Sequence, residues 1–84
     1  MPSGVETKIN MDTIGGRIKY ARKRKKMTQQ CLCDEMGGAD ISNISRIERG
    51  LQIPLMKTIN SIADALGVDP EWITTGEGSM DMRY

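Results

Sequence analysis

Apolar residues recur along this chain at intervals of three and four, the spacing that places side chains on one face of an α-helix. No stretch shows the strict alternation of apolar and polar residues that is typical of a half-buried β-strand. Glycines, prolines and capping residues divide the pattern into five parts. We therefore predict an all-α fold, a compact domain of five short helices.

Four helices are predicted with both ends and a fifth with its start, over residues 13–25, 29–36, 41–49, 55–66 and from Pro70 onward. Residues whose side-chain oxygens can accept a backbone N–H begin four of them: Asp12 or Thr13, Thr28, Asp40 and Asp69. Three are followed by glycine, which terminates helices readily: Gly37, Gly50 and Gly67. The predicted core consists of the apolar residues at helical spacing: Ile14, Ile18, Ala21, Leu32, Cys33, Met36, Ile44, Ile47, Leu55, Ile59, Ile62, Ala63, Leu66, Trp72 and Ile73.

One charge lies on a face that should be buried. In DISNISRIERG (residues 40–50), Glu48 follows Ile44 by four positions and so shares its side of the helix with Ile44 and Ile47. A buried carboxylate is rare unless a partner pairs with it. Arg22, four positions after Ile18, lies on the inner face of the first helix by the same reasoning.

Composition narrows the class of protein. With 84 residues, 38% of them hydrophobic and 27% charged, the chain has the length and composition of one folded domain. No apolar run is long enough to span a membrane, and the N-terminus has no secretory signal, so we expect a cytoplasmic protein. With no histidine and no nucleophile beside a base, we expect neither an enzyme nor a cofactor.

The two cysteines, Cys31 and Cys33, are two apart in a predicted helix and therefore diverge. They are poorly placed to share a metal or to form a disulfide, and a zinc site would lack its other ligands. We interpret Cys33 as a small buried residue and Cys31 as a surface thiol, and we expect no metal site.

The net charge of +1 averages two unlike parts of the chain. Residues 13–57 hold ten Lys or Arg against four Asp or Glu, whereas residues 58–84 hold one base against five acids. Such asymmetry suggests a polyanionic partner on one face, although RIKYARKRKK (residues 17–26) could also be a solvated helix surface. The short, glycine-containing connection between the second and third helices predicts a steep crossing, the helix-turn-helix arrangement.

The segments TQQCLCDEMGG, ISNISRIERG and LQIPLMKTINSIADALGVDPEWI resemble the phage-repressor and Cro family of helix-turn-helix regulators. The resemblance covers residues 13–76 and rests on the order and spacing of these segments together. It implies a lambda-repressor-like DNA-binding domain whose third helix enters the major groove. The turn departs from the family: the interval from Gly37 to Ile44 is one residue longer than usual, so the assigned start of the third helix can be off by one.

The resemblance also assigns roles to residues. It implies a structural ion pair between Glu48 and Arg22, and a phosphate contact from Gln29, to which the neighbouring Thr28 can add. On the helix wheel, Ser42, Ser45, Arg46 and Arg49 face outward, with Ile41 at the border. By resemblance the bases are read by Ile41, Ser42, Ser45 and Arg46, although the serines could be ordinary surface residues and Ile41 could pack against the turn. Further phosphate contacts are expected from three flanking residues, Asn43, Arg49 and Lys57.

We predict a sequence-specific double-stranded DNA-binding regulator, a phage or prophage repressor that acts as a homodimer on a palindromic operator. A restriction-modification controller or an antitoxin-type regulator is an alternative, and a helical protein-interaction module is a third. Residues 1–11 are expected to form an arm, residues 12–76 the DNA-binding domain, and residues 77–84 a tail or the start of a linker. Self-association is expected through the outer helices, at Trp72, Ile73 and the tail.

Overall fold

The predicted helices are all present in the computed structural model, which describes residues 9–80. They are α1 (Ile14–Arg24), α2 (Gln29–Glu35), α3 (Ile41–Glu48), α4 (Met56–Leu66) and α5 (Pro70–Thr75). Each end that the sequence predicted lies within one residue of its observed position. Residues 9–80 contain no other helix and no β-strand. The expected arm starts before the described residues, and the expected tail ends after them.

The helix starts follow from their capping residues. Four side chains accept a backbone N–H of the first turn: Thr13 from Gly16, Thr28 from Cys31, Asp40 from Ser42 and Asp69 from Glu71. These contacts satisfy donors that have no partner inside the helix. Helix α4 begins differently, because its N-cap residue, Leu55, makes no side-chain capping hydrogen bond.

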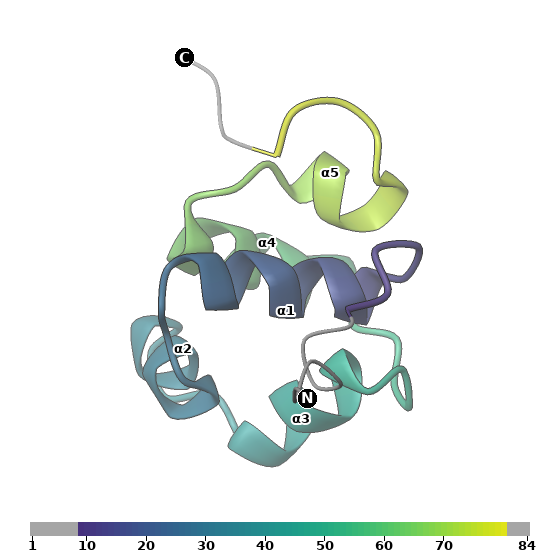
Figure 1. Ribbon diagram of the computed structural model, residues 1–84. Helices are drawn as coiled ribbons and strands as arrows, with labels where there is room; N and C mark the ends of the chain where they lie inside the picture. Colours follow the sequence, from purple (N-terminus) through teal and green to yellow (C-terminus); the bar gives the residue numbers. More distant parts are fainter. Residues whose placement is uncertain (1–8, 81–84) are drawn as a thin grey trace, which may run out of the picture.

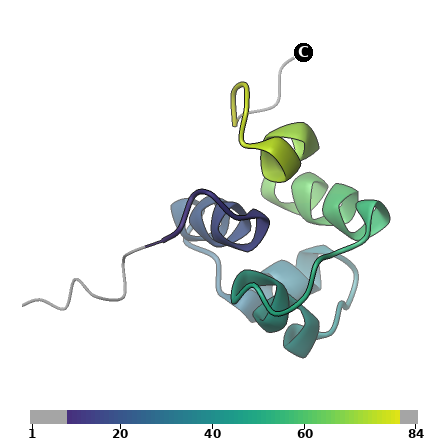
Figure 2. The same cartoon turned by 90° about the vertical axis from the view of Figure 1, so that its right-hand side faces the viewer.

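Helix α1 lies at the centre of the arrangement and packs against α3, α4 and α5 (Figure 1). Figure 2 shows α2 and α3 on one side of α1 and α5 on the other. Helix α2 packs against both α3 and α4, which closes the domain around a single core. None of the helices within residues 9–80 has the length and apolar character needed to cross a membrane.

The core confirms most of the predicted inner positions and corrects one of them. Ile18, Leu32, Ile62 and Ile73 are completely buried, and Ile14 and Met36 pack partly buried against the core. Leu55 was predicted in the core, and this is wrong: its side chain is 73% exposed. It precedes the first turn of α4, so the helical spacing that it shares with Ile59 does not place both on one face.

A glycine pair at the start of α1 permits close contact between backbones. A Cβ atom on Gly15 would lie 2.1 Å from the carbonyl oxygen of Ile47 at the end of α3. A Cβ atom on Gly16 would lie 1.7 Å from the carbonyl oxygen of Asn10. Glycine is a weak helix former, but Gly15 allows α1 to approach the C-terminal end of α3, and Gly16 allows the chain before α1 to fold back on its first turn.

Arg17 is a buried cation that the sequence pattern did not single out. Its side chain is 7% exposed and donates to three backbone carbonyls, those of Met11 (2.8 Å), Ile73 (2.8 Å) and Thr74 (3.2 Å). Two of these carbonyls belong to the last turn of α5, where the helix dipole is negative and a cation is favoured. Arg17 therefore joins the beginning of α1 to the end of α5.

The turn between α2 and α3 contains two consecutive glycines in the left-handed region, Gly37 at φ 90° and Gly38 at φ 100°. Other residues adopt these angles only with strain. The two glycines let the chain turn between α2 and α3, and α3 begins at Ile41, its predicted first residue.

Candidate nucleic-acid interface

Helix α3 has two chemically distinct faces. Its inner face carries Ile44, Ile47 and Glu48, which are between 1% and 9% exposed. Its outward face carries Ser42 and Arg46, which are exposed, and Ser45, which is half-buried. The division agrees with the helix-wheel prediction. It leaves the polar positions free to meet a partner while the apolar ones hold the helix in place.

The inner face contains the predicted ion pair. The Nε and Nη2 atoms of Arg22 donate to the two carboxylate oxygens of Glu48 at 2.7 and 2.9 Å. The side chains of Arg22 and Glu48 are only 8% and 2% exposed. Arg22 also donates to the carbonyl of Met27 at 2.8 Å. This two-pronged geometry satisfies both buried charges and fixes the end of α3 against α1.

Gln29 extends this pair to the start of α2. Its amide nitrogen donates to Oε1 of Glu48 at 3.1 Å, a contact that the sequence did not predict. A primary amide has two N–H donors, so one remains for another acceptor. The same carboxylate therefore positions Gln29, the residue expected to bind a phosphate.

The outward side chains line a shallow surface depression beside Gln29. Its lining consists of six residues that the sequence assigned to DNA contacts: Gln29, Ile41, Ser42, Ser45, Arg46 and Arg49. Ile41 is 40% exposed, so it lies on this surface rather than inside the fold. The structure thus brings all four candidate base-reading residues to one side of the molecule.

Arg46 is held in place on that surface by two neutral acceptors. Its Nε donates to Oε1 of Gln52 at 3.1 Å, and its Nη2 donates to Oδ1 of Asn43 at 2.8 Å. Neither partner is charged, so the positive charge of Arg46 is not neutralised by these contacts. Nη1 and one N–H of Nη2 are not used by them and can donate to another molecule.

The remaining candidate phosphate contacts lie around this surface. Thr28 is exposed at the start of α2, where its hydroxyl accepts from the backbone of Cys31 and keeps its own O–H to donate. Lys57 is exposed in the first turn of α4 and lines a neighbouring pocket together with Asn43 and Asp40. Lys57 is therefore separate from the depression that contains Arg46.

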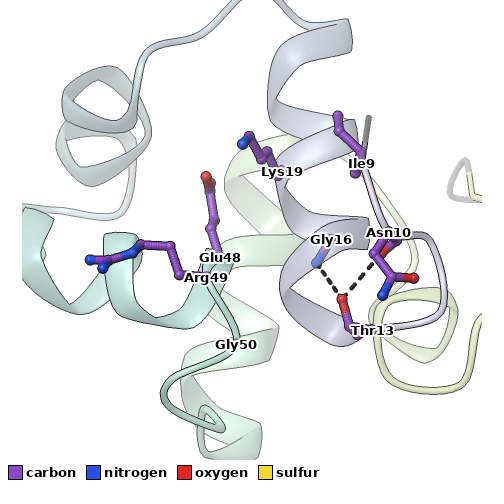
Figure 3. Close-up of a pocket in the computed structure, with 8 residues that line it drawn as sticks. All are labelled: Ile9, Asn10, Thr13, Gly16, Lys19, Glu48, Arg49 and Gly50. Carbon is purple, nitrogen blue, oxygen red and sulfur yellow. Dashed lines mark hydrogen bonds between the residues drawn. The ribbon is translucent and has the colours of Figure 1, made fainter. Parts of the chain in front are cut away.

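A pocket next to the ion pair shows how the end of α3 meets α1 (Figure 3). Thr13 caps α1 through Gly16 at 2.9 Å and donates to the carbonyl of Asn10 at 3.1 Å. Glu48 extends alongside α1, whereas its neighbour Arg49 points away from α1. The last residue of α3 thus faces α1, whereas the C-cap residue that follows it points to a different side of the molecule.

A family model described as helix-turn-helix matches residues 18–73 of the chain, the region that contains α2, the glycine turn and α3. The chain belongs to the helix-turn-helix family. This agrees with the resemblance inferred from the sequence segments and with the predicted five-helix fold.

Three curated proteins are similar in sequence to this chain. The transcriptional regulator PrtR of Pseudomonas aeruginosa is 36% identical over 92% of the chain, and the transcriptional regulator DicA of Escherichia coli is 37% identical over 77%. The immunity repressor protein of Bacillus phage phi105 is 39% identical over 67% of the chain. The chain spans only 29%, 47% and 38% of these three proteins, respectively.

A solved helix-turn-helix structure is also similar. The restriction-modification controller protein C.AhdI from Aeromonas hydrophila superposes with a TM-score of 0.69 at 27% identity. The match covers 75% of this chain and 94% of the controller.

The cysteines of this helix-turn-helix chain lie in different environments, as predicted. Cys31 is exposed at the start of α2, whereas Cys33 is buried in the core. Burial raises the pKa of the Cys33 thiol, and the nearby carboxylates of Asp34, Asp40 and Glu48 raise it further. Residues 9–80 contain no cluster of cysteine and carboxylate side chains suited to hold a metal ion.

Proposed function

We propose that the chain is a sequence-specific, double-stranded DNA-binding transcriptional regulator, most similar in function to phage or prophage repressors. The observation that carries this proposal is the outward surface of α3, where polar side chains and an uncompensated arginine gather beside the start of α2. An α-helix fits the major groove, and such donors can bond to base edges there. A regulator of this kind would act in the bacterial cytoplasm, on the nucleoid.

In this proposal, Ile41, Ser42, Ser45 and Arg46 contact base edges. Arg46 can donate to O6 and N7 of one guanine, and the apolar side chain of Ile41 can contact a thymine methyl group. Phosphates are bound by the side chains that flank this surface: Thr28, Gln29, Asn43, Arg49 and Lys57. Backbone contacts of this type set the position of the protein on the duplex, while the base contacts set the preferred sequence.

The regulatory effect would be repression, by occupying an operator that overlaps a promoter. Two copies bound to a palindrome would double the length of sequence recognised and match the two-fold symmetry of the site. The proposed DNA-binding domain comprises residues 12–76. Because the chain spans less than half of each curated relative, whatever the rest of those proteins does is not carried over.

A restriction-modification controller is the second candidate. The similarity to the C.AhdI controller favours it, because nearly the whole of that protein is matched by this chain. Both candidates use the same DNA-binding surface and differ in the genes that they control.

Selection of bound sequences from random duplexes tests the proposal. We expect one enriched, palindromic sequence, bound at least about a thousandfold more tightly than random DNA. The slope of log affinity against log salt should be negative, because phosphate contacts release counterions. Absence of any enriched sequence would contradict the proposal, and salt-insensitive binding of another protein would favour an interaction module instead.

A further inference from the structure

The last helix offers no apolar surface at the residues predicted for one. Trp72 and Ile73 were expected to mediate self-association, and this is wrong, because they are 7% and 0% exposed. Their side chains are part of the core that packs α5 against α1 and α4. An apolar surface that a small molecule can contact lies instead between the α2–α3 turn and α4.

A pocket of about 270 Å³ opens between that turn, α3 and the first two turns of α4. Its apolar lining consists of Ile44 and Ile47 from the core and the partly buried side chains of Met36 and Ala39. Ligand pockets combine such a lining with a few polar groups that fix the orientation of the ligand, and their volumes are commonly about 300–1,000 Å³. This pocket lies just below that range, so it fits only a small molecule.

The polar groups of the pocket include two opposite charges. Asp40 lines it from the start of α3, and Lys57 lines it from the first turn of α4. Oδ1 of Asp40 accepts the backbone N–H of Ser42 at 3.0 Å, whereas no hydrogen bond within residues 9–80 uses its Oδ2. Lys57 is exposed, and its ammonium group forms no ion pair in the described part of the chain. One carboxylate oxygen and one ammonium group are therefore free to meet a ligand.

These features together define the chemical class of the ligand. A molecule with one cationic and one anionic group can pair with Asp40 and Lys57 at once, whereas a singly charged molecule leaves one of them without a partner. The apolar lining favours a hydrocarbon side chain. An apolar α-amino acid carries all three parts, an ammonium group, a carboxylate and a hydrocarbon side chain, and it is small.

Two residues of the pocket also belong to the surface that we propose for DNA. Lys57 is a proposed phosphate contact, and Oδ1 of Asn43, which lines the pocket, accepts from Nη2 of Arg46 at 2.8 Å. A ligand carboxylate on Lys57 would neutralise a charge that a phosphate otherwise meets. Because the two sites share residues, binding at one weakens binding at the other by the same factor.

We propose that this pocket binds an apolar α-amino acid and that the bound amino acid lowers the affinity of the chain for DNA. The ammonium group pairs with Asp40, the carboxylate pairs with Lys57, and the side chain packs on Met36 and Ile44. The effect on DNA rests on the proposed function, whereas the binding of the amino acid does not. For L-leucine, with about nine non-hydrogen atoms in an open pocket, we expect a Kd on the order of 1 mM.

Titration of L-leucine into the free protein, followed by the NMR shifts of the backbone amides, tests the site. We expect saturable shifts within residues 36–47 and 57–61. Two analogues that each lack one charged group, 4-methylpentanoate and 3-methylbutylamine, should bind about two- to fivefold more weakly, the value of an exposed ion pair. Glycine, which lacks the hydrocarbon side chain, should bind more than about tenfold more weakly. No saturable shift up to about 50 mM L-leucine, well above the expected Kd, would overturn the site.

Asp40→Asn removes one charge of the pocket and keeps the helix cap, because asparagine caps helices as well as aspartate does. This variant should bind L-leucine about two- to fivefold more weakly than wild type. Asp64→Asn is the matched control, since Asp64 is an exposed aspartate of α4 that does not line the pocket. Equal losses in both variants would mean that net charge matters and the pocket does not, which would overturn the proposal.

Binding of the selected operator in about 50 mM L-leucine tests the effect on DNA. Affinity should fall about fivefold, the lower end of typical coupling between two sites. Glycine at the same concentration controls for a general effect of zwitterions and should change little. In Lys57→Gln the effect of leucine should shrink, because the shared charge is gone. If leucine shifts the pocket amides and leaves operator affinity unchanged, the coupling is overturned. If wild type without leucine shows no preference for the selected sequence, the proposed function fails, and the titration of free protein still decides the site.

Discussion

Arg22 lies on the inner face of α1 and Arg46 on the outward face of α3, and their guanidinium groups are held by different kinds of partner. Arg22 is buried and pairs with both oxygens of a carboxylate, Glu48. Arg46 is exposed and donates to two neutral amide oxygens, those of Asn43 and Gln52. Both guanidinium groups are fixed in direction by two partners. Of these two partner sets, only that of Arg22 neutralises the charge of the guanidinium group.

The difference shows how one residue type can serve structure and recognition in one small domain. The carboxylate partner makes burial of Arg22 possible and neutralises the charge of Arg22 inside the fold. Amide partners orient Arg46 without neutralising it, so that its field still attracts an anionic partner. We therefore propose that Arg22 serves stability and Arg46 serves binding, and each of the following substitutions tests one side of that division.

The largest effect is expected at the buried pair. Arg22→Ala or Glu48→Ala should each lower the free energy of unfolding by about 3–5 kcal/mol, because either change leaves one buried charge without its partner. The double variant should lose much less than the sum of the two. Chemical denaturation of all four proteins provides the double-mutant cycle, and additive losses would contradict the coupling.

Arg46→Ala should lower the affinity for DNA and leave the free energy of unfolding nearly unchanged. Its unfolding free energy should change by less than about 0.5 kcal/mol, since the residue is exposed. Binding to the selected operator should weaken by about 1–3 kcal/mol, and the preference at one base pair of each half-site should relax. Equal losses on operator and random duplex would instead make Arg46 a phosphate contact.

Gln52→Met sharpens the comparison further, because it removes the acceptor for Arg46 and nearly preserves side-chain size. We expect a loss of about 0.5–1.5 kcal/mol on the operator, the value of one hydrogen bond, with little change on random DNA. Gln30→Met is the matched control, since Gln30 is an exposed glutamine that donates to Asp34 on α2 instead. If both variants bind like wild type, the contact with Gln52 does not orient Arg46.

Lys57→Ala should give the smallest change in operator affinity at moderate salt. Lys57 is exposed in α4, away from the depression that contains Arg46, so we expect all sequences to weaken alike. The slope of log affinity against log salt should fall by about one unit. A loss confined to the operator would show that Lys57 contributes to sequence preference.

The helices could be predicted because their signals are local, whereas the pairing of Glu48 with Arg22 was implied by the resemblance to the helix-turn-helix family. Thr28 and Asp40 cap helices through side chains near in sequence, and Glu48 stood out as a charge among inward apolar positions. Arg17 could not be found in this way, because two of its partners are backbone carbonyls 56 and 57 residues away, and any residue carries a carbonyl. A helical period could not identify Gln52 either, since it lies beyond the end of α3.

The sequence misjudged Leu55 for a related reason. Helical spacing predicts a shared face only when the whole interval is helical, and Leu55 stands just before α4 begins. Gly15 is likewise recognisable in the sequence as a weak helix former, but the backbone of α3 that lies against it could not be predicted.

The two faces of α3 have a consequence for how such a protein could change its target during evolution. Everything that orients the helix lies inward: Ile44, Ile47, Glu48 and the backbone contact at Gly15. Of the outward positions, 42 and 46 are exposed and 45 is half-buried, and none belongs to the hydrophobic core, so they can be exchanged with little cost to folding. Under the proposed function, a new operator would therefore require only a few surface substitutions, and the buried residues that orient the helix would stay unchanged.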